Sequence, residues 1–133
     1  MLLFEHYVAP SPIHGLGVFS ACFIPKGTRT WEFHPAIDIL IPRAELAGLP
    51  AHVLRLVAMR TEYLVDQDAY LWGMDGDQFV NHTDDPSIRK VGSEWITCRD
   101  IGIGEEVTYD YRDTLVPGYN PDDGLPHSGH CGS

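Results

Sequence analysis

Two short strings in this chain combine polar and aromatic residues at spacings that could do chemistry. The first, Phe-Val-Asn-His-Thr-Asp-Asp-Pro at residues 79–86, runs from an apolar pair straight into Asn81 and His82. Burying an amide and an imidazole is costly unless both are hydrogen-bonded. These two side chains therefore either terminate and cap a turn or offer donors and acceptors to a ligand.

The second string, Gly-Glu-Glu-Val-Thr-Tyr-Asp-Tyr at residues 104–111, is typical of a short strand that follows a glycine turn. Side chains two apart in a strand point to one side, so Tyr109 and Tyr111 are expected on the same face. Paired tyrosines are found at the edge of a core, with their phenols reaching water. Next to an Asn-His pair, two hydroxyl groups could also act on a bound reactant.

A glycine turn is expected much earlier, where His14, Gly15, Leu16 and Gly17 follow each other. The string contains only G-x-G and lacks the third glycine and the helix of a dinucleotide-binding fingerprint. It is either a plain turn or a place where the backbone approaches a ligand closely, since glycine has no Cβ.

The two strings resemble motifs of the SET domain, the fold of most protein lysine methyltransferases. Residues 79–86 are similar to F-I-N-H-S-x-x-P, with Thr83 in place of Ser, and residues 104–111 are similar to G-E-E-L-T-x-D-Y. The resemblance extends from about residue 13 to residue 111. It implies an S-adenosylmethionine-dependent methyltransferase that acts on a lysine side chain of a basic protein or peptide.

The resemblance also assigns roles to residues. Tyr111 is expected to be the catalytic tyrosine, and Tyr109 falls where the family chooses between Phe and Tyr to limit the number of methyl groups. The residues expected to bind the cofactor are His14, Gly15, Leu16, Gly17, Tyr63, Asn81 and His82.

The predicted substrate channel contains Phe33 together with Tyr109 and Tyr111. Phe33 stands where the family's V-x-E-Y-x-G strand has a tyrosine, and no cysteine-rich segments flank the domain. Tyr119, the C-terminal tail or a second copy of the chain would then close the channel. Two alternatives stay open: an inactive SET-fold module that binds the cofactor or a lysine-rich peptide, and a small β-rich interaction domain with accidental motif matches.

The elements expected around these motifs are mainly β, in a β-clip-like SET fold of several short sheets with a knotted-looking C-terminal segment. One small helical insert is expected at residues 43–47 and 50–59, because Pro42 and Pro50 suit first helical turns. The predicted strands are residues 2–8, 18–20, 28–33, 36–41, 63–65, 69–72, 87–91, 94–99 and 106–111. Residues 1–112 form the predicted domain, and the Pro/Gly/Asp-rich residues 113–133 form a tail on or near the channel.

Composition limits the partners. A chain of 133 residues suits one domain, and a formal net charge of −10 should repel nucleic acid while attracting basic proteins or merely aiding solubility. No membrane span or signal peptide is visible, which favours a cytoplasmic protein, or a nuclear one in a eukaryote. The three cysteines include no C-x-x-C pair, so no metal is expected, although Cys131 with His127 and His130 could form a site.

Overall fold

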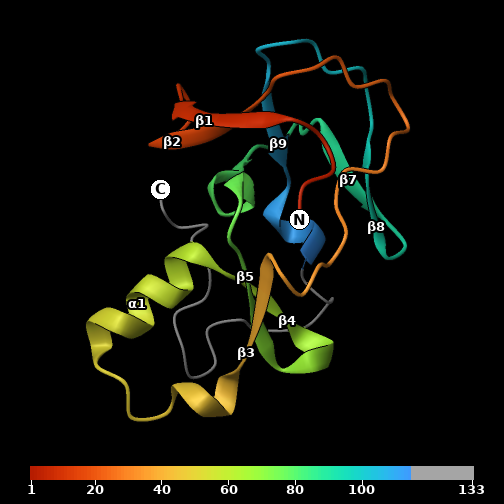
Figure 1. Ribbon diagram of the computed structural model, residues 1–133. Coiled ribbons are helices and arrows are strands. Elements are labelled where there is room, and N and C mark those ends of the chain that lie inside the picture. Colours follow the sequence, from red (N-terminus) through yellow and green to blue (C-terminus); the bar gives the residue numbers. More distant parts are fainter. Residues whose placement is uncertain (115–133) are drawn as a thin grey trace.

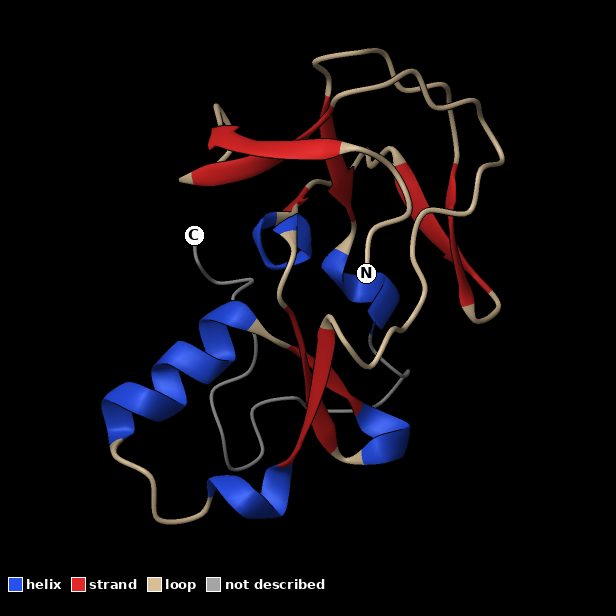
Figure 2. Ribbon diagram, in the orientation of Figure 1, coloured by secondary structure: helices blue, strands red, loops and turns tan. Residues whose placement is uncertain are grey.

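The chain folds into two β-sheets, and short helical turns lie between them. A computed structural model describes residues 1–114 (Figures 1 and 2). The strands are β1 (His6–Pro10), β2 (Leu16–Ser20), β3 (Asp38–Pro42), β4 (Glu62–Leu64), β5 (Ala69–Gly73), β6 (Asn81–His82), β7 (Ile88–Val91), β8 (Glu94–Thr97) and β9 (Glu106–Tyr109). The helices are α1 (Ala51–Arg60) and the 3₁₀ turns η1 (Arg43–Leu46), η2 (Val65–Gln67), η3 (Gly76–Phe79) and η4 (Tyr111–Thr114).

Strand β9 is the centre of the larger sheet. The sheet has the order β1-β2-β9-β7-β8, and β6 also pairs with β9. The pairing of β9 is antiparallel with β2 but parallel with β6 and β7. In the register of β6, Asn81 lies opposite Thr108 and His82 lies opposite Tyr109. This parallel pair brings the Asn-His string and the tyrosine string side by side.

The smaller sheet, β3-β5-β4, lies with α1 on the other side of the molecule (Figure 1). Each sheet has its own apolar cluster, one around Ile101 and Val107 and one around Leu46, Val57 and Tyr70. The turns η3 and η4 contact strands of both sheets. The space between the sheets is therefore bordered by β4, β5, β9 and these two turns.

Several predicted elements are confirmed. The helical insert forms with Pro50 as the residue before α1, and Val57 lies on its buried face. The hairpin of β7 and β8 turns through Gly92, which has a φ of 65°. The first strand begins later than predicted, at His6, and runs to Pro10. A proline is tolerated there because β1 is an edge strand.

Other strand predictions are also wrong in extent, and two of them have a clear structural cause. Residues 28–33 pair only as isolated bridges, because Arg29 faces Ile96 whereas Trp31 faces Leu2 on a different segment. The last strand ends at Tyr109 and not at residue 111. The Asp110 carboxylate there accepts a hydrogen bond from the Arg112 N–H at 2.9 Å, which turns the chain into η4.

Within residues 1–114 the structure contains no helix that could cross a membrane. The same residues hold no cluster of three or more His, Cys, Asp or Glu side chains arranged for a metal ion. From residue 115 on, the predicted tail, including Tyr119 and the conceivable site at His127, His130 and Cys131, lies outside the described residues.

Candidate active site

Two cavities meet between the sheets and share one wall. The first, of about 210 Å³, opens beside the turn at residues 14–16, and we call it the turn cavity. The second, of about 380 Å³, is bordered by Trp31 and Trp95, and we call it the tryptophan cavity. The side chains common to both, which we call the shared wall, are Glu62, Leu71, Asp77, Val80 and Tyr109.

Asn81 holds the turn against the larger sheet. Its Nδ2 donates to the carbonyl oxygens of His14 and Leu16 and to Oε2 of Glu106, each at 3.0 Å. Three acceptors around this atom identify it as the amide nitrogen. The amide oxygen of Asn81 therefore faces the other way, and it accepts no hydrogen bond from residues 1–114. Because Asn81 lines the turn cavity, that oxygen can accept a hydrogen bond from a ligand.

Gly17 makes room for the side chain of Glu106. A Cβ at this position would overlap the Glu106 carboxylate and approach Cβ of Ser11 to 2.9 Å. The Ser11 hydroxyl in turn donates to the Glu106 carboxylate at 2.8 Å. Gly17 thus lets Glu106 reach both Ser11 and Asn81, and it does not border either cavity.

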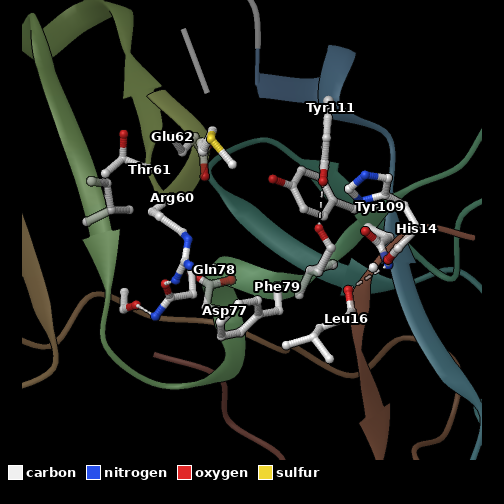
Figure 3. A pocket seen from close by; sticks show the side chains of 16 residues that line it. His14, Leu16, Arg60, Thr61, Glu62, Asp77, Gln78, Phe79, Tyr109 and Tyr111 are labelled. Carbon is white, nitrogen blue, oxygen red and sulfur yellow. Dashed lines mark hydrogen bonds between the residues drawn. The ribbon is translucent and has the colours of Figure 1, made fainter. Parts of the chain in front are cut away.

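Tyr111 and Tyr109 lie together although only Tyr109 belongs to β9. Their ring centroids are 4.9 Å apart, and the Tyr111 hydroxyl donates to the carbonyl oxygen of Val80 at 2.8 Å (Figure 3). The Tyr109 ring also meets the Trp95 ring edge-on at 5.1 Å. Its hydroxyl end points into the turn cavity. Burial, together with the nearby Glu62 carboxyl, raises the pKa of Tyr109 well above its ordinary value, so this phenol stays neutral.

His82 positions Tyr111 without bordering either cavity. The backbone N–H of Tyr111 donates to Nδ1 of His82 at 3.1 Å, and the two rings are 5.2 Å apart. Since that nitrogen accepts, the imidazole proton resides on Nε2, which lies 3.3 Å from Oδ1 of Asp84. The imidazole therefore fixes the backbone at the residue where the chain leaves β9.

The remaining predicted residues divide between the cavities. His14, Gly15 and Leu16 line the turn cavity together with Asn81, Tyr109 and Tyr111, whereas Phe33 and Tyr109 line the tryptophan cavity. Tyr63 borders neither one. Its ring packs on Tyr70 at 5.0 Å, and its hydroxyl donates to Oδ1 of Asp68 at 2.5 Å.

Arg60 and its neighbours were not singled out from the sequence. The Arg60 guanidinium lies 5.3 Å from the centroid of the Phe79 ring and donates to Oε1 of Gln78 at 3.1 Å. All three side chains line the turn cavity (Figure 3). Arg60 ends α1, and nothing in the sequence indicates that the last turn of this helix faces Phe79.

Two acidic residues of the shared wall were also missed. Burial, and then the charge of the Asp77 carboxyl, raise the pKa of Glu62 to about 8, although Lys90 opposes the rise. Burial and then the Asp75 carboxyl raise the pKa of Asp77 to about 6. The sequence could have indicated Glu62, because side chains alternate along a strand such as β4 and Glu62 therefore lies on the face opposite Tyr63.

Comparisons with known proteins identify the family and the fold. A family model described as SET domain matches residues 15–112, and a search of curated proteins finds no match. A Plasmodium falciparum protein described as a candidate histone methyltransferase has a TM-score of 0.55 and 20% identity over 83% of this chain and 95% of that one.

Two structures of Polycomb Repressive Complex 2 also align. The humanized Chaetomium thermophilum complex bound to an inhibitor has a TM-score of 0.56 and 24% identity, covering 84% of this chain and 15% of that one. An apo form has a TM-score of 0.59 and 23% identity, covering 86% and 16%. This chain thus spans about one-sixth of their length, and at these identities the likeness shows the fold alone. The family match, however, includes both motif strings and most of the sequence, so the chain belongs to the SET domain family.

Proposed function

We propose that this protein transfers a methyl group from S-adenosylmethionine to a lysine side chain of a basic protein. The observation that carries this proposal is the shared wall, where a cavity on one side and a cavity on the other meet at Tyr109. An in-line displacement needs two reactants that approach from opposite sides in a fixed alignment. Two cavities that meet at one wall satisfy that requirement.

The residues of the turn cavity fit the groups of S-adenosylmethionine. The amide oxygen of Asn81 can accept from its ammonium group, and the Arg60 guanidinium can pair with its carboxylate. Met59 and Phe79 offer apolar surface to the adenine ring. When bound, the cofactor supplies the methyl group and a positive sulfonium. The tyrosine rings and the acidic side chains of the shared wall can face that charge.

Tyr111 would orient the amine. Its hydroxyl proton is committed to the carbonyl oxygen of Val80, at 2.8 Å. A hydroxyl that donates in this way still has lone pairs with which to accept. The Tyr111 oxygen can therefore accept a hydrogen bond from the amine nitrogen and direct the lone pair of that nitrogen toward the methyl carbon.

The tryptophan cavity would receive the lysine. Trp31, Phe33 and Trp95 line it, so the aliphatic part of the side chain is enclosed by apolar surface and shielded from water. These apolar side chains also disfavour the ammonium form relative to the neutral amine. Tyr109, which borders both cavities, would then limit how many methyl groups the nitrogen can carry.

A calorimetric measurement of S-adenosylmethionine binding tests the cofactor part of this proposal. Arg60→Met removes the guanidinium from the turn cavity and should weaken binding about 10-fold or more, the usual worth of a hydrogen bond to a charged group. The matched control is Arg55→Met, because Arg55 is an exposed arginine of the same helix that lines neither cavity. Equal affinities of the two variants, or no binding by the intact protein, would contradict the proposal.

Asn81→Ala would be a less specific test of cofactor binding than Arg60→Met. Because Asn81 holds the carbonyl oxygens of His14 and Leu16, its loss would release the turn as well as remove a ligand contact.

A second function, binding without transfer, is favoured by Phe33, which lacks the hydroxyl expected there. Incubation with S-adenosylmethionine tritiated in its methyl group and a histone mixture separates the two, because a binding module would leave the histones unlabelled.

A further inference from the structure

The proposed reaction requires a group that accepts one proton from the substrate. A lysine side chain reaches the protein as an ammonium group, since its ordinary pKa is about 10.4, and it must lose a proton before its nitrogen can accept a methyl group. Trp31, Phe33 and Trp95 of the tryptophan cavity disfavour the charge, but these apolar side chains cannot accept the proton. The shared wall is where the nitrogen must arrive, so an acceptor is expected among its side chains.

Glu62 is a carboxyl group of the shared wall. It lines both cavities, and Figure 3 shows it across the turn cavity from the hydroxyl end of Tyr109. It belongs to β4, so a paired strand fixes its backbone. Its carboxyl group forms no hydrogen bond or ion pair with any of residues 1–114. An acidic side chain held between two cavities with no partner of its own is available to a cation that enters either one.

The other side chains of the wall do not suit this role. Leu71 and Val80 are apolar, and Tyr109 keeps its proton because its pKa is raised. Asp77 has a lower affinity for a proton than Glu62, with a pKa of about 6 against about 8. A base works best when its pKa lies near the operating pH, and among these groups Glu62 fits that condition.

We propose that Glu62 accepts the proton of the substrate ammonium and that Asp77 is a positioning residue which acts on Glu62 through its charge. This inference rests on the proposed function. A proton passes from the ammonium nitrogen to a carboxylate oxygen of Glu62. The nitrogen lone pair then forms the bond to the methyl carbon while the carbon–sulfur bond breaks and leaves its electron pair on sulfur. Glu62 afterwards returns the proton to water through the cavities.

The charged groups that face Glu62 come from three elements. Asp77 of η3 raises its pKa, Lys90 of β7 lowers it, and Tyr109 of β9 is neutral. Asp77 itself faces Asp75 and Asp38, which raise its pKa, and the N-terminal ammonium, which lowers it. Changing Asp77→Asn removes a negative neighbour of Glu62, so the pH at which Glu62 titrates should fall.

The first test is independent of turnover. In protein labelled with ¹³C at the glutamate carboxyl carbon, the Glu62 signal is identified by its loss in Glu62→Gln, and its titration midpoint is expected near pH 8. Adding n-butylammonium, which mimics a lysine side chain, should lower that midpoint by at least one pH unit, whereas n-butanol should leave it unchanged. Identical midpoints with both probes would overturn the proposal.

The second test uses transfer to the histone mixture. For the intact protein, kcat/KM should rise with pH along a limb near pH 8. In Glu62→Gln this limb should disappear and kcat/KM should fall about 100-fold. The variant should still bind S-adenosylmethionine. Asp77→Asn should move the limb to lower pH, an effect that a merely structural residue would not have. The control is Glu45→Gln, an exposed glutamate outside both cavities.

The outcomes of the two tests separate the two proposals. A Glu62→Gln variant with an unchanged rate and limb would overturn the role of Glu62 while leaving the methyltransferase in place. No labelling by the intact protein at any pH would overturn the methyltransferase, and the carboxyl titration would still decide whether an ammonium group meets Glu62. If Glu62→Gln does not fold, an unshifted limb in the pH dependence of kcat/KM for Asp77→Asn would overturn the proposal.

Discussion

At the scale of single residues, Tyr111 is the side chain whose placement most constrains the chemistry. Its backbone N–H is held by His82 and its hydroxyl by the carbonyl oxygen of Val80. Both partners come from the segment that contains β6, so one short stretch of chain fixes the tyrosine at two points. Such restraint is what a group needs in order to align a reacting nitrogen.

Tyr111→Phe removes the hydroxyl and keeps the ring. We expect methyl transfer to fall about 100-fold, the size of effect that loss of alignment produces. The affinity for S-adenosylmethionine should stay within about twofold, because in the proposed reaction the hydroxyl acts on the amine and not on the cofactor's anchoring groups. Transfer of a tritiated methyl group and calorimetry measure the two quantities.

Tyr63→Phe is the matched control for this change. It also deletes one phenolic hydroxyl, which bonds Asp68 outside both cavities. It should cost about 1 kcal/mol of stability at most and leave turnover unchanged. A loss of turnover in Tyr63→Phe equal to that in Tyr111→Phe would mean that the structural assignment of these two tyrosines is wrong.

The sequence predicted single residues best where a motif named them. Asn81, Tyr109 and Tyr111 were singled out, and the structure brings all three to the turn cavity. Glu62 was not singled out, because the resemblance drew attention to its neighbour Tyr63. No motif marks Arg60 either, because its position depends on how α1 packs beside Phe79, and tertiary packing of this kind is not visible in local sequence.

At the scale of elements, the parallel pairing of β6 with β9 assembles the site. Turn chemistry predicted most elements correctly, including the β7–β8 hairpin and the insert that ends in α1. The same local reasoning gave a strand at residues 28–33, which have strong β propensity but alternate between two partner segments. It also extended β9 to residue 111, because the hydrogen bond from the Arg112 N–H to Asp110 depends on a turn that propensity does not reveal.

Gly17→Ala tests the packing between β2 and β9. The added methyl group would overlap the Glu106 carboxylate and crowd Ser11, so we expect a loss of about 1–3 kcal/mol in the free energy of unfolding. Urea denaturation measures it. Gly102→Ala is the control, because a Cβ there would meet nothing closer than 3.8 Å. Similar stabilities of both variants would show that Glu106 can move aside without cost.

At the scale of the whole molecule, the wall carboxyls link stability to pH. The folded chain keeps the Glu62 proton up to about pH 8, whereas the ordinary pKa of such a group is 4.5. The folded state therefore binds more protons than the unfolded state between these values, and stability falls as the pH rises. The slope for one such group approaches roughly 1.4 kcal/mol per pH unit.

Urea denaturation of the intact protein and of Glu62→Gln between pH 5 and pH 8 measures this linkage. We expect the intact protein to lose roughly 2–3 kcal/mol relative to the variant over that range, because the variant has no proton to release at residue 62. Asp77 adds to the decline in both proteins up to about pH 6. Parallel curves for the two proteins would show that Glu62 ionises in the folded state at its ordinary pKa.

The net charge of −10 should govern how substrates are recruited. A peptide of alternating lysine and glycine is expected to bind about 10-fold more weakly at 0.5 M salt than at 0.05 M, because salt screens charges that are not in direct contact. Fluorescence anisotropy measures the affinity. The same peptide with acetylated lysines should bind weakly at both salt concentrations, and a salt-independent affinity of the unmodified peptide would contradict this view.

Four residues from three segments of the chain, Ser11, Gly17, Asn81 and Glu106, meet around one carboxylate. The other three all depend on Glu106, since Gly17 makes room for its carboxylate and the carboxylate accepts hydrogen bonds from Ser11 and Asn81. A change at any one of them leaves the others with a clash or a lost bond. Through evolution these four positions should therefore be inherited together, and a lineage that loses Glu106 should be free to place a larger residue at position 17.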